Sequence, residues 1–417
     1  MRFNALCRSI FITLAALPIF VACANKTKEI QPTPDSAPLE AKIGQMLMVG
    51  FRGMTADEGD FIVRDIRRHY LGGVILFDHD VLTGQAVRNI ESPKQVETLI
   101  SSLQAASPTP LLIAVDQEGG RVARLKERYG FPATISHGEL GRIGDPDATA
   151  RKSREMAGTL AHLGFGLNLA PVIDLCANPD NPVIAGLDRC FSADPARVAT
   201  HALEFIDAHH SQGVLSTLKH FPGHGSSPSD SHLGFTDVTG TWTRSELEPY
   251  ARIIEAGKAD AVMTAHVFNA RLDPVYPATL SRNIITGILR RELGFNGVVL
   301  SDDMQMGAIV GQYGLKRAIR RTIEAGVDIL VFANNLEYDE EIVPRAVGII
   351  RDLVEAGILS ESRIDESYAR ILRLKGQLKD NNAPSNKEYG SNQVPLGSKR
   401  PQNERENLQD GRAIFLF

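Results

Sequence analysis

The stretch VLSTLKH, residues 214–220, is a run of aliphatic and β-branched residues that ends in two titratable side chains. Gly213 precedes it, and the turn-forming sequence PGHG follows at residues 222–225. A parallel strand that is buried on both faces reads as such an uninterrupted apolar run. Similar runs predict seven further strands, at residues 43–51, 73–77, 111–116, 166–174, 260–266, 297–302 and 327–333.

The segments between these runs have the start and stop signals of helices. Ser92 before Pro93 and Asp194 before Pro195 are typical N-caps, and Thr243 with Glu246 matches a capping box. Glycines that suit a left-handed helix end stand before the next run, at Gly164, Gly213, Gly257, Gly294 and Gly326.

Eight strands, each followed by a helical pattern, predict a TIM-type (β/α)8 barrel that forms a single catalytic domain over residues 40–376. The competing fold is a doubly wound open sheet. That fold normally has fewer strands, and no GxGxxG element follows the first run.

The composition is that of a globular protein with 43% hydrophobic residues. There are 45 Lys and Arg against 50 Asp and Glu, and no basic block is dense enough to follow a phosphate backbone, so no nucleic-acid partner is expected. Residues 377–417 are polar and contain several Pro and Gly, which predicts a disordered tail. A tail of this length is too short for a second catalytic domain.

The N-terminus has the pattern of an export signal, which we assign to residues 1–23. Arg2 and Arg8 precede a short apolar run, and FVAC resembles a lipoprotein box that would anchor the protein to a membrane through lipidated Cys23. Simple cleavage after Ala24 is the alternative. Residues 24–39 would then be a linker, and the protein would lie in the cell envelope, in the periplasm or on a membrane.

Two cysteines remain in the body of the chain, Cys176 and Cys190. An oxidising compartment permits them to pair. Spacing alone does not establish disulfide geometry, so two buried thiols are an equal alternative.

Polar residues end five of the eight runs. They are Asp116, Asp174, Lys219 with His220, His266, and Asp302 with Asp303. In a barrel of this type the carboxyl ends of the strands meet at one face, where catalytic side chains lie. These residues are therefore expected at one mouth.

The richest segment is KHFPGHGSSPSDSH, residues 219–232, here called the histidine loop. His220, His224, His232 and Asp230 are legitimate zinc ligands, so a metallohydrolase is one interpretation. In the other, Asp230 and His232 point to the same side of an extended segment, and the carboxylate orients the imidazole for acid/base work.

Three motifs together resemble the glycoside hydrolase family 3 β-N-acetylglucosaminidases of the NagZ type. They are KHFPGHG with Asp230-Ser231-His232 after a further four residues, VDQEGGRVAR at 115–124 and LSDDM at 300–304. The resemblance covers residues 40–375. It implies a TIM barrel without cofactor or metal, with Asp302 as nucleophile and His232, partnered by Asp230, as acid/base.

By motif, the resemblance also assigns sugar-binding roles to Asp116, Arg124, Arg189, Lys219 and His220. Two-domain relatives take their acid/base from a following domain, which the tail here could not supply. The chain departs from the family pattern at Gln305, at FDHD (residues 77–80) and at Cys190, where Ser is usual. If Cys190 paired with Cys176, the bridge would brace the loop that bears Arg189.

The expected activity is that of a retaining β-N-acetylhexosaminidase that releases terminal β-linked N-acetylglucosamine from peptidoglycan fragments or chitooligosaccharides. Its partner would be a small carbohydrate, and a monomer is expected. A family 3 glycosidase or phosphorylase with another donor sugar is an alternative, and so is a non-catalytic sugar-binding envelope lipoprotein.

Overall fold

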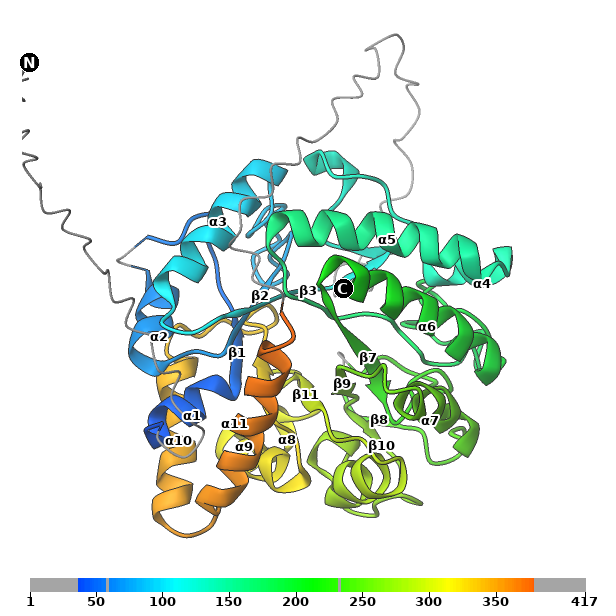
Figure 1. Cartoon of the computed structure of the whole chain (residues 1–417). Coiled ribbons are helices and arrows are strands. Elements are labelled where there is room, and N and C mark those ends of the chain that lie inside the picture. Colours follow the sequence, from blue (N-terminus) through cyan, green and yellow to red (C-terminus); the bar gives the residue numbers. More distant parts are fainter. Residues whose placement is uncertain (1–36, 58–59, 232–233, 379–417) are drawn as a thin grey trace, which may run out of the picture.

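Eight parallel strands form a closed barrel, surrounded by helices (Figure 1). The computed structural model describes residues 37–57, 60–231 and 234–378. The strands follow one another around the barrel in the order β1-β12-β11-β9-β7-β6-β3-β2. The predicted TIM-type barrel is therefore confirmed. The barrel strands are β1 (Leu47–Gly50), β2 (Gly73–Leu76), β3 (Leu112–Val115), β6 (Leu167–Asn168), β7 (Leu215–Phe221), β9 (Ala261–Thr264), β11 (Val298–Asp303) and β12 (Ile329–Phe332).

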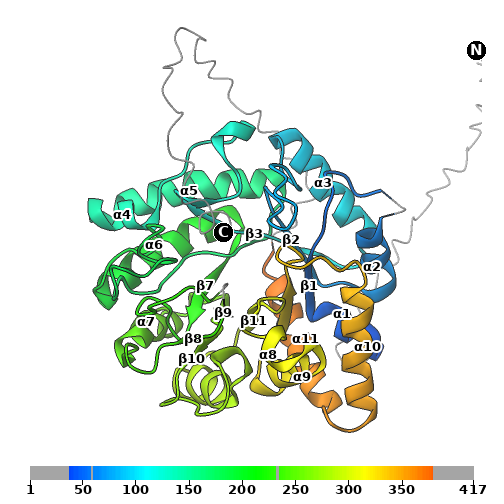
Figure 2. The ribbon, with the colours of Figure 1, turned by 180° about the vertical axis from the view of Figure 1, so that it is seen from behind.

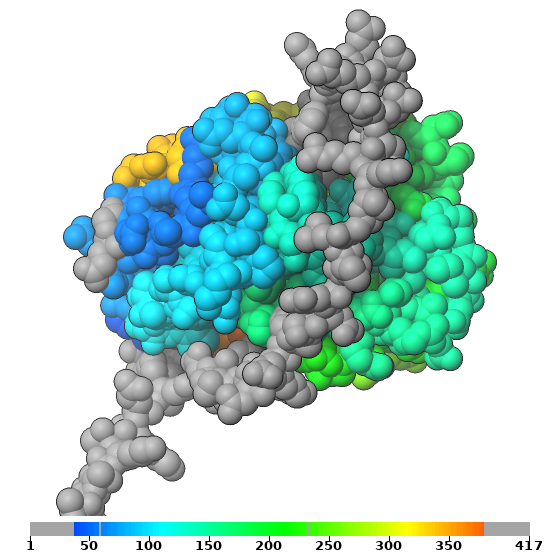
Figure 3. Space-filling model, turned by 90° about the horizontal axis from the view of Figure 1, so that it is seen from above, coloured from blue at the N-terminus to red at the C-terminus, as the bar shows by residue number. Residues whose placement is uncertain are grey.

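One long helix returns the chain after each barrel strand, and together these helices form the outer ring seen from behind in Figure 2. They are α2 (Phe61–His69), α3 (Pro93–Ala106), α5 (Pro146–Leu163), α6 (Pro195–Gln212), α7 (Glu248–Glu255), the π-helix η5 (Asn283–Glu292), α9 (Leu315–Ala325) and α10 (Ile342–Glu355). In the space-filling view of Figure 3, the blue and cyan segments of α2 and α3 lie beside the teal segment of α5.

Shorter elements lie in the connections between strands and helices. The helical ones are α4 (His137–Ile143), α8 (Val310–Tyr313), η2 (Glu127–Tyr129), η3 (Arg244–Leu247) and η4 (Ala278–Leu280). Two small sheets pair β4 (Gln117–Gly119) with β5 (Val122–Ala123) and β8 (Thr236–Asp237) with β10 (Val267–Phe268).

Two further helices, α1 (Leu39–Gln45) and α11 (Glu361–Lys375), close the amino-terminal face of the barrel. Helix α11, orange, lies in front of the strands in Figure 1 and behind them in Figure 2. Lys375 Nζ donates to Gln45 Oε1 at 2.6 Å, and Arg363 Nη2 donates to the Val327 carbonyl at 2.7 Å. Gln45 and Val327 each stand two residues before a barrel strand, so α11 covers the end of the barrel opposite the mouth.

Most of the predicted helix signals are confirmed. Ser92 Oγ accepts a hydrogen bond from the Gln95 amide, and the Asp194 carboxylate accepts one from the Ala196 amide, with proline at the first helical position in both helices. The five predicted stop glycines all have positive φ, between 67° and 115°. Their lack of a side chain permits the left-handed turn into the next strand.

Two strand predictions need correction in their extent. Residues 39–45 form α1, so the first strand begins at Leu47, not at residue 43. Both segments are buried, and a short apolar run does not distinguish a buried helix from a buried strand. In the fourth run only Leu167 and Asn168 form a strand. Pro171, which has no N–H to donate, interrupts the ladder, and Val172 pairs again with Lys219.

The capping box predicted at Thr243 and Glu246 is wrong. The Thr243 side chain makes no capping hydrogen bond, and a 3-10 turn, η3, begins there. Glu246 is instead buried and bonded to the histidine loop.

The predicted signal peptide at residues 1–23, the lipidation site Cys23 and most of the linker at 24–39 lie outside the described residues. So does the predicted tail, apart from residues 377 and 378. Among the residues that the structure describes, no helix has the length and apolar character needed to span a membrane.

Candidate active site

A pocket opens at the carboxyl ends of the barrel strands. Together with the solvent space at its open mouth, it has a volume of about 720 Å³. Ile75, Met263 and Val331 contribute apolar walls from β2, β9 and β12. Apolar walls with a few converging polar groups are typical of a small-molecule site. Six of the eight predicted site residues line this pocket, namely Asp116, Arg124, Arg189, Lys219, His220 and Asp302.

These six side chains come from separate segments that the barrel brings together. Asp116 directly follows β3, Lys219 and His220 lie near the end of β7, and Asp302 lies on β11. Arg124 follows the small β4–β5 hairpin, and Arg189 comes from the connection between β6 and α6. Asp116, Lys219, His220, Asp302 and Asp303 thus meet at one mouth as predicted, whereas Asp174 and His266 end their runs without lining the pocket.

A chain of ion pairs connects the polar lining. Lys219 Nζ lies 2.8 Å from Asp116 Oδ1 and 2.7 Å from Glu118 Oε1. Arg189 forms a two-pronged pair with Glu118, at 2.8 Å from each carboxylate oxygen. Its Nη2 also lies 3.3 Å from His220 Nε2. Bidentate pairs of this kind fix orientation as well as charge, so Arg189 and Lys219 are held in place before any substrate binds.

The cations in this network keep its carboxylates ionised. Burial alone would raise the pKa of Asp116, but Lys219 and Arg124 hold that pKa below its usual value. Burial acts in the same way on Glu118, and there Arg189 and Lys219 hold the pKa well below its usual value. Because Asp116 stays charged, it presents hydrogen-bond acceptors to the pocket.

The two neighbouring aspartates on β11 have different surroundings. Both carboxylates line the pocket, and Asp302 Oδ1 accepts a hydrogen bond from the Asp303 amide at 2.8 Å. The Asp303 carboxylate accepts bonds from the amides of Gln305 (3.1 Å) and Ala333 (3.0 Å). Asp303 thus braces the turn after β11.

The histidine loop begins beside the pocket with His220. Asp174 Oδ2 accepts from His220 Nδ1 at 2.7 Å, and Asp174 Oδ1 accepts from the His224 amide at 2.7 Å. His224 Nε2 lies 3.0 Å from Ser231 Oγ, further along the loop. Asp174 therefore fixes both the ring of His220 and the start of the loop.

The structure describes only Asp230 of the predicted acid/base pair. Asp230 is half-buried on the histidine loop and is not among the residues that line the pocket. His232 lies outside the described residues. The pairing of Asp230 with His232 therefore stays a prediction.

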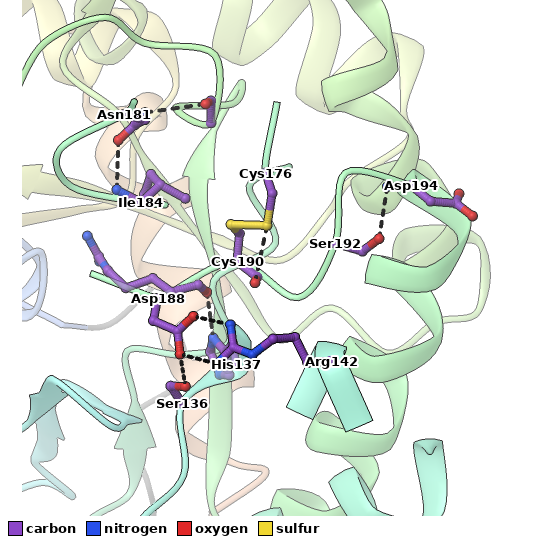
Figure 4. Close-up of a disulfide and its surroundings, with 12 residues drawn as sticks. Ser136, His137, Arg142, Cys176, Asn181, Ile184, Asp188, Cys190, Ser192 and Asp194 are labelled. Atoms are coloured by element: carbon purple, nitrogen blue, oxygen red, sulfur yellow. Dashed lines mark hydrogen bonds and ion pairs between the residues drawn. A yellow bond between two sulfur atoms is a disulfide. The ribbon is translucent and has the colours of Figure 1, made fainter. Parts of the chain in front are cut away.

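Cys176 and Cys190 form a disulfide, with Cα atoms 5.5 Å apart, which decides between the two alternatives left open by the sequence (Figure 4). The bridge closes the segment from Cys176 to Cys190, which carries Arg189. This segment with the two residues that follow it, residues 176–192, is here called the arginine loop. Next to Arg189, Asp188 bonds Ser136 and forms an ion pair with Arg142 at 2.7 Å. The arginine loop is thus fixed on both sides of Arg189.

Of the residues that depart from the family pattern, Phe77 lines the pocket, and Asp78 is paired with the pocket residue Arg124 at 3.8 Å. The carboxylate of Asp78 accepts from Lys126 at 2.6 Å and that of Asp80 from Arg52 at 2.7 Å. Gln305 Nε2 donates to Asn334 Oδ1 at 2.9 Å. None of Asp78, Asp80 and Gln305 lines the described pocket.

Sequence reasoning assigned no site role to three acidic residues that organise this region. The sequence predicts no role for Glu118, places Asp174 at the mouth only as the end of an apolar run, and places Glu246 in a capping box. Glu118 does stand in the VDQEGGRVAR motif and Asp174 does end a strand run, so both carried a signal. Nothing in the sequence pointed from Glu246 to the histidine loop.

The zinc-site interpretation receives no support within residues 37–57, 60–231 and 234–378, where no group of three His, Cys, Asp or Glu side chains is arranged to hold a metal ion. Since His232 stands outside these ranges, that interpretation is not tested in full.

Carboxylates, arginine, lysine and histidine around the open mouth of a closed parallel barrel form an arrangement suited to binding a small polar molecule such as a sugar. A family model described as the glycosyl hydrolase family 3 N-terminal domain matches residues 38–374. The chain belongs to glycoside hydrolase family 3.

Two relatives show the extent of the similarity. The chain is 33% identical over 402 residues to β-hexosaminidase A of Pseudoalteromonas piscicida, a match that covers 87% of the chain and 64% of that protein. It is 40% identical over 296 residues to a β-hexosaminidase of Xylella fastidiosa (strain M23), which covers 69% of the chain and 82% of that protein.

Solved structures agree with this assignment. The glycoside hydrolase family 3 β-N-acetylglucosaminidase from Paenibacillus sp. str. FPU-7 matches with a TM-score of 0.77 and 35% identity, covering 87% of this chain and 66% of that one. The β-N-acetylhexosaminidase from Beutenbergia cavernae DSM 12333 matches with a TM-score of 0.73 and 30% identity, covering 82% and 99%. Family and relatives together support a glycoside hydrolase with hexosaminidase activity.

Proposed function

We propose that the chain is a retaining β-N-acetylhexosaminidase that releases terminal β-linked N-acetylglucosamine from peptidoglycan fragments or chitooligosaccharides. The observation that carries the proposal is the position of Asp302, at the end of β11 in a pocket that it shares with Asp116, Arg189, Lys219 and His220. A nucleophile needs such a neighbouring set of groups to hold the sugar in a reactive position.

In the proposed first step the Asp302 carboxylate attacks the anomeric carbon while the bond to the leaving sugar breaks. The leaving oxygen takes a proton from His232. In the second step neutral His232 removes a proton from water, the water oxygen attacks the anomeric carbon, and Asp302 leaves as a carboxylate. An imidazole suits both steps because its unperturbed pKa is about 6.5.

The proposed role of the remaining lining is to bind the sugar. Asp116 is held ionised between Lys219 and Arg124, so it can accept hydrogen bonds from two sugar hydroxyls. Arg189 and Lys219 are already fixed by Glu118, which lowers the cost of ordering them when the sugar binds.

We further propose export to the cell envelope, with lipidation of Cys23 as the anchor. The apolar run that follows Arg8 and the FVAC sequence support this proposal. Expression of the full chain beside Cys23→Ala, with separation of membrane and soluble fractions, tests it. Loss of membrane association in the variant is expected, and an unchanged distribution would refute lipid anchoring at this residue.

The test of the activity compares chromogenic β-glycosides of N-acetylglucosamine, glucose and xylose, with and without added phosphate. Hydrolysis confined to the N-acetylglucosaminide is expected. Asp302→Asn should lower kcat by on the order of 10⁴-fold or more, and His232→Ala by about 10²- to 10⁴-fold. Phosphate-dependent turnover would instead identify a phosphorylase, and a folded protein without activity would point to a sugar-binding protein.

A further inference from the structure

The start of the histidine loop is enclosed by two carboxylates from different parts of the chain. Asp174, described above, reaches it from the segment after β6. Glu246 reaches it from the other side, from the 3-10 turn η3. Glu246 is buried, with 1% of its surface exposed.

Glu246 binds the loop at two consecutive residues. Its Oε1 accepts from the Ser226 hydroxyl at 2.5 Å, and its Oε2 accepts from the Gly225 amide at 3.2 Å. Asp230 follows only four residues after Ser226, so these bonds fix the backbone just before the predicted acid/base pair.

The loop backbone is packed tightly between the two sides. A Cβ at Gly223, where φ is +124°, would lie 2.5 Å from Glu246 Oε2. A Cβ at Gly225 would lie 1.8 Å from the Leu175 carbonyl oxygen. The glycines let the loop approach Glu246 on one side and the segment after Asp174 on the other.

A carboxyl group at this position is costly. Burial, together with the charge of Asp174, raises the pKa of Glu246 to about 7. An apolar residue would avoid this cost but would leave the Gly225 amide and the Ser226 hydroxyl without an acceptor. The hydrogen bonds that the carboxyl group accepts from Gly225 and Ser226 offset the cost of burying it.

We propose that Glu246 is a positioning residue of the proposed reaction: by holding Gly225 and Ser226 it fixes the part of the histidine loop that leads to Asp230, and so supports proton transfer to the leaving-group oxygen. The inference rests on the proposed function. Arg189 and Lys219 are held by a different carboxylate, Glu118, and the ring of His220 is held by Asp174. Loss of Glu246 therefore affects proton transfer and spares sugar binding.

The test compares Glu246→Ala, Glu246→Gln and Ser226→Ala with the wild-type full chain. Each protein is assayed on a chitooligosaccharide, whose leaving group needs a proton, and on a dinitrophenyl N-acetylglucosaminide, whose leaving group does not. Glu246→Ala should lower kcat on the oligosaccharide by roughly 10- to 100-fold, with KM within about twofold and a much smaller effect on the dinitrophenyl substrate. Glu246→Gln, which keeps one acceptor, and Ser226→Ala should show a smaller loss of the same kind.

Glu248→Gln is the matched control, because Glu248 is exposed two residues further on and should leave kcat unchanged. Circular dichroism checks that each variant is folded, and the Gln and Ser226 variants keep the test valid if Glu246→Ala does not fold. Equal losses on both substrates, or no loss in any folded variant, would overturn the inference.

His232→Ala in the same panel separates the two hypotheses. If His232→Ala lowers kcat equally on the oligosaccharide and on the dinitrophenyl substrate, the proposed acid/base role itself fails. If His232→Ala lowers kcat mainly on the oligosaccharide and the Glu246 variants do not, only the positioning role fails.

Discussion

The arginine loop and the histidine loop lie at the same mouth but are held by different means. The arginine loop has a covalent bridge, Cys176–Cys190, and its Arg189 is paired with Glu118 inside the protein. The histidine loop contains no cysteine, and hydrogen bonds to Asp174 and Glu246 hold its first residues. Under the proposed function, the group that binds the sugar keeps one position, whereas the acid/base group serves two successive steps.

The largest effect is expected from removing the ion pair that anchors the arginine loop to Glu118. Arg189→Met should lower the free energy of unfolding by about 3 kcal/mol or more, because Glu118 keeps its buried charge and loses its bidentate partner. Urea denaturation at neutral pH measures the change. KM should rise as well.

The double variant Arg189→Met/Glu118→Gln controls for loss of packing around the arginine. It should recover part of the lost stability, since no buried carboxylate is then left without its guanidinium. A double variant no more stable than the single one would show that the pair is not the cause.

Removing the bridge should have the next largest effect. Cys176→Ser/Cys190→Ser should lower the free energy of unfolding by about 2 to 3 kcal/mol, because the bridge closes a segment of 14 residues. Since Arg189 adjoins Cys190, KM should rise more than kcat falls. Steady-state kinetics with and without a reducing agent measures this, and the double variant should not respond to the reductant.

The two loops should respond differently to pH, because Glu246, which anchors the histidine loop, titrates near neutral pH. Burial raises the pKa of Glu246 from 4.5 to about 7. Folded protein therefore retains a proton that the unfolded chain releases, so this group's stabilisation is complete below pH 4.5 and is lost as the pH rises to about 7. The groups around it are Asp174, Tyr250 and the Ser226 hydroxyl.

Glu246→Gln does not titrate, so its stability relative to wild type should increase by about 2 to 3 kcal/mol between pH 4.5 and 7. Urea denaturation across this range checks the change. A difference that stays constant with pH would mean that the carboxyl titrates normally in the folded state.

The smallest effect is expected from a neutral anchor of the histidine loop. Trp242 Nε1 donates to the Pro222 carbonyl at 3.0 Å, and Trp242→Phe should cost about 1 kcal/mol. Trp242 is the only tryptophan in the chain, so thermal unfolding has to be followed by circular dichroism. No change in Tm would show that this bond contributes nothing to the loop.

The barrel and most of its lining were predictable from sequence because strand ends are marked locally. Asp116, Lys219 and Asp302 each end an apolar run, and the topology of a parallel barrel then brings them together. Helix starts at Ser92 and Asp194 were predictable for the same reason, since a cap depends on residues close by in sequence.

What sequence could not predict depends on contacts between distant segments. Glu246 fits a capping box, yet its carboxyl bonds Ser226, 20 residues earlier. The pairing of Cys176 with Cys190 likewise depends on how the arginine loop folds back. A local pattern gives no information on which partner a buried polar group will find.

Helix α11 has a consequence for how the molecule folds. Its bonds to α1 join residues 319 to 330 positions apart, as in Lys42 with Glu361 and Lys375 with Gln45. Such contacts form only after almost the whole barrel is available, and contacts so distant in sequence are slow to close. Until α11 has been synthesised, the strand ends beneath β1 and β12 lack their cover. Incomplete chains should therefore aggregate readily and depend on chaperones.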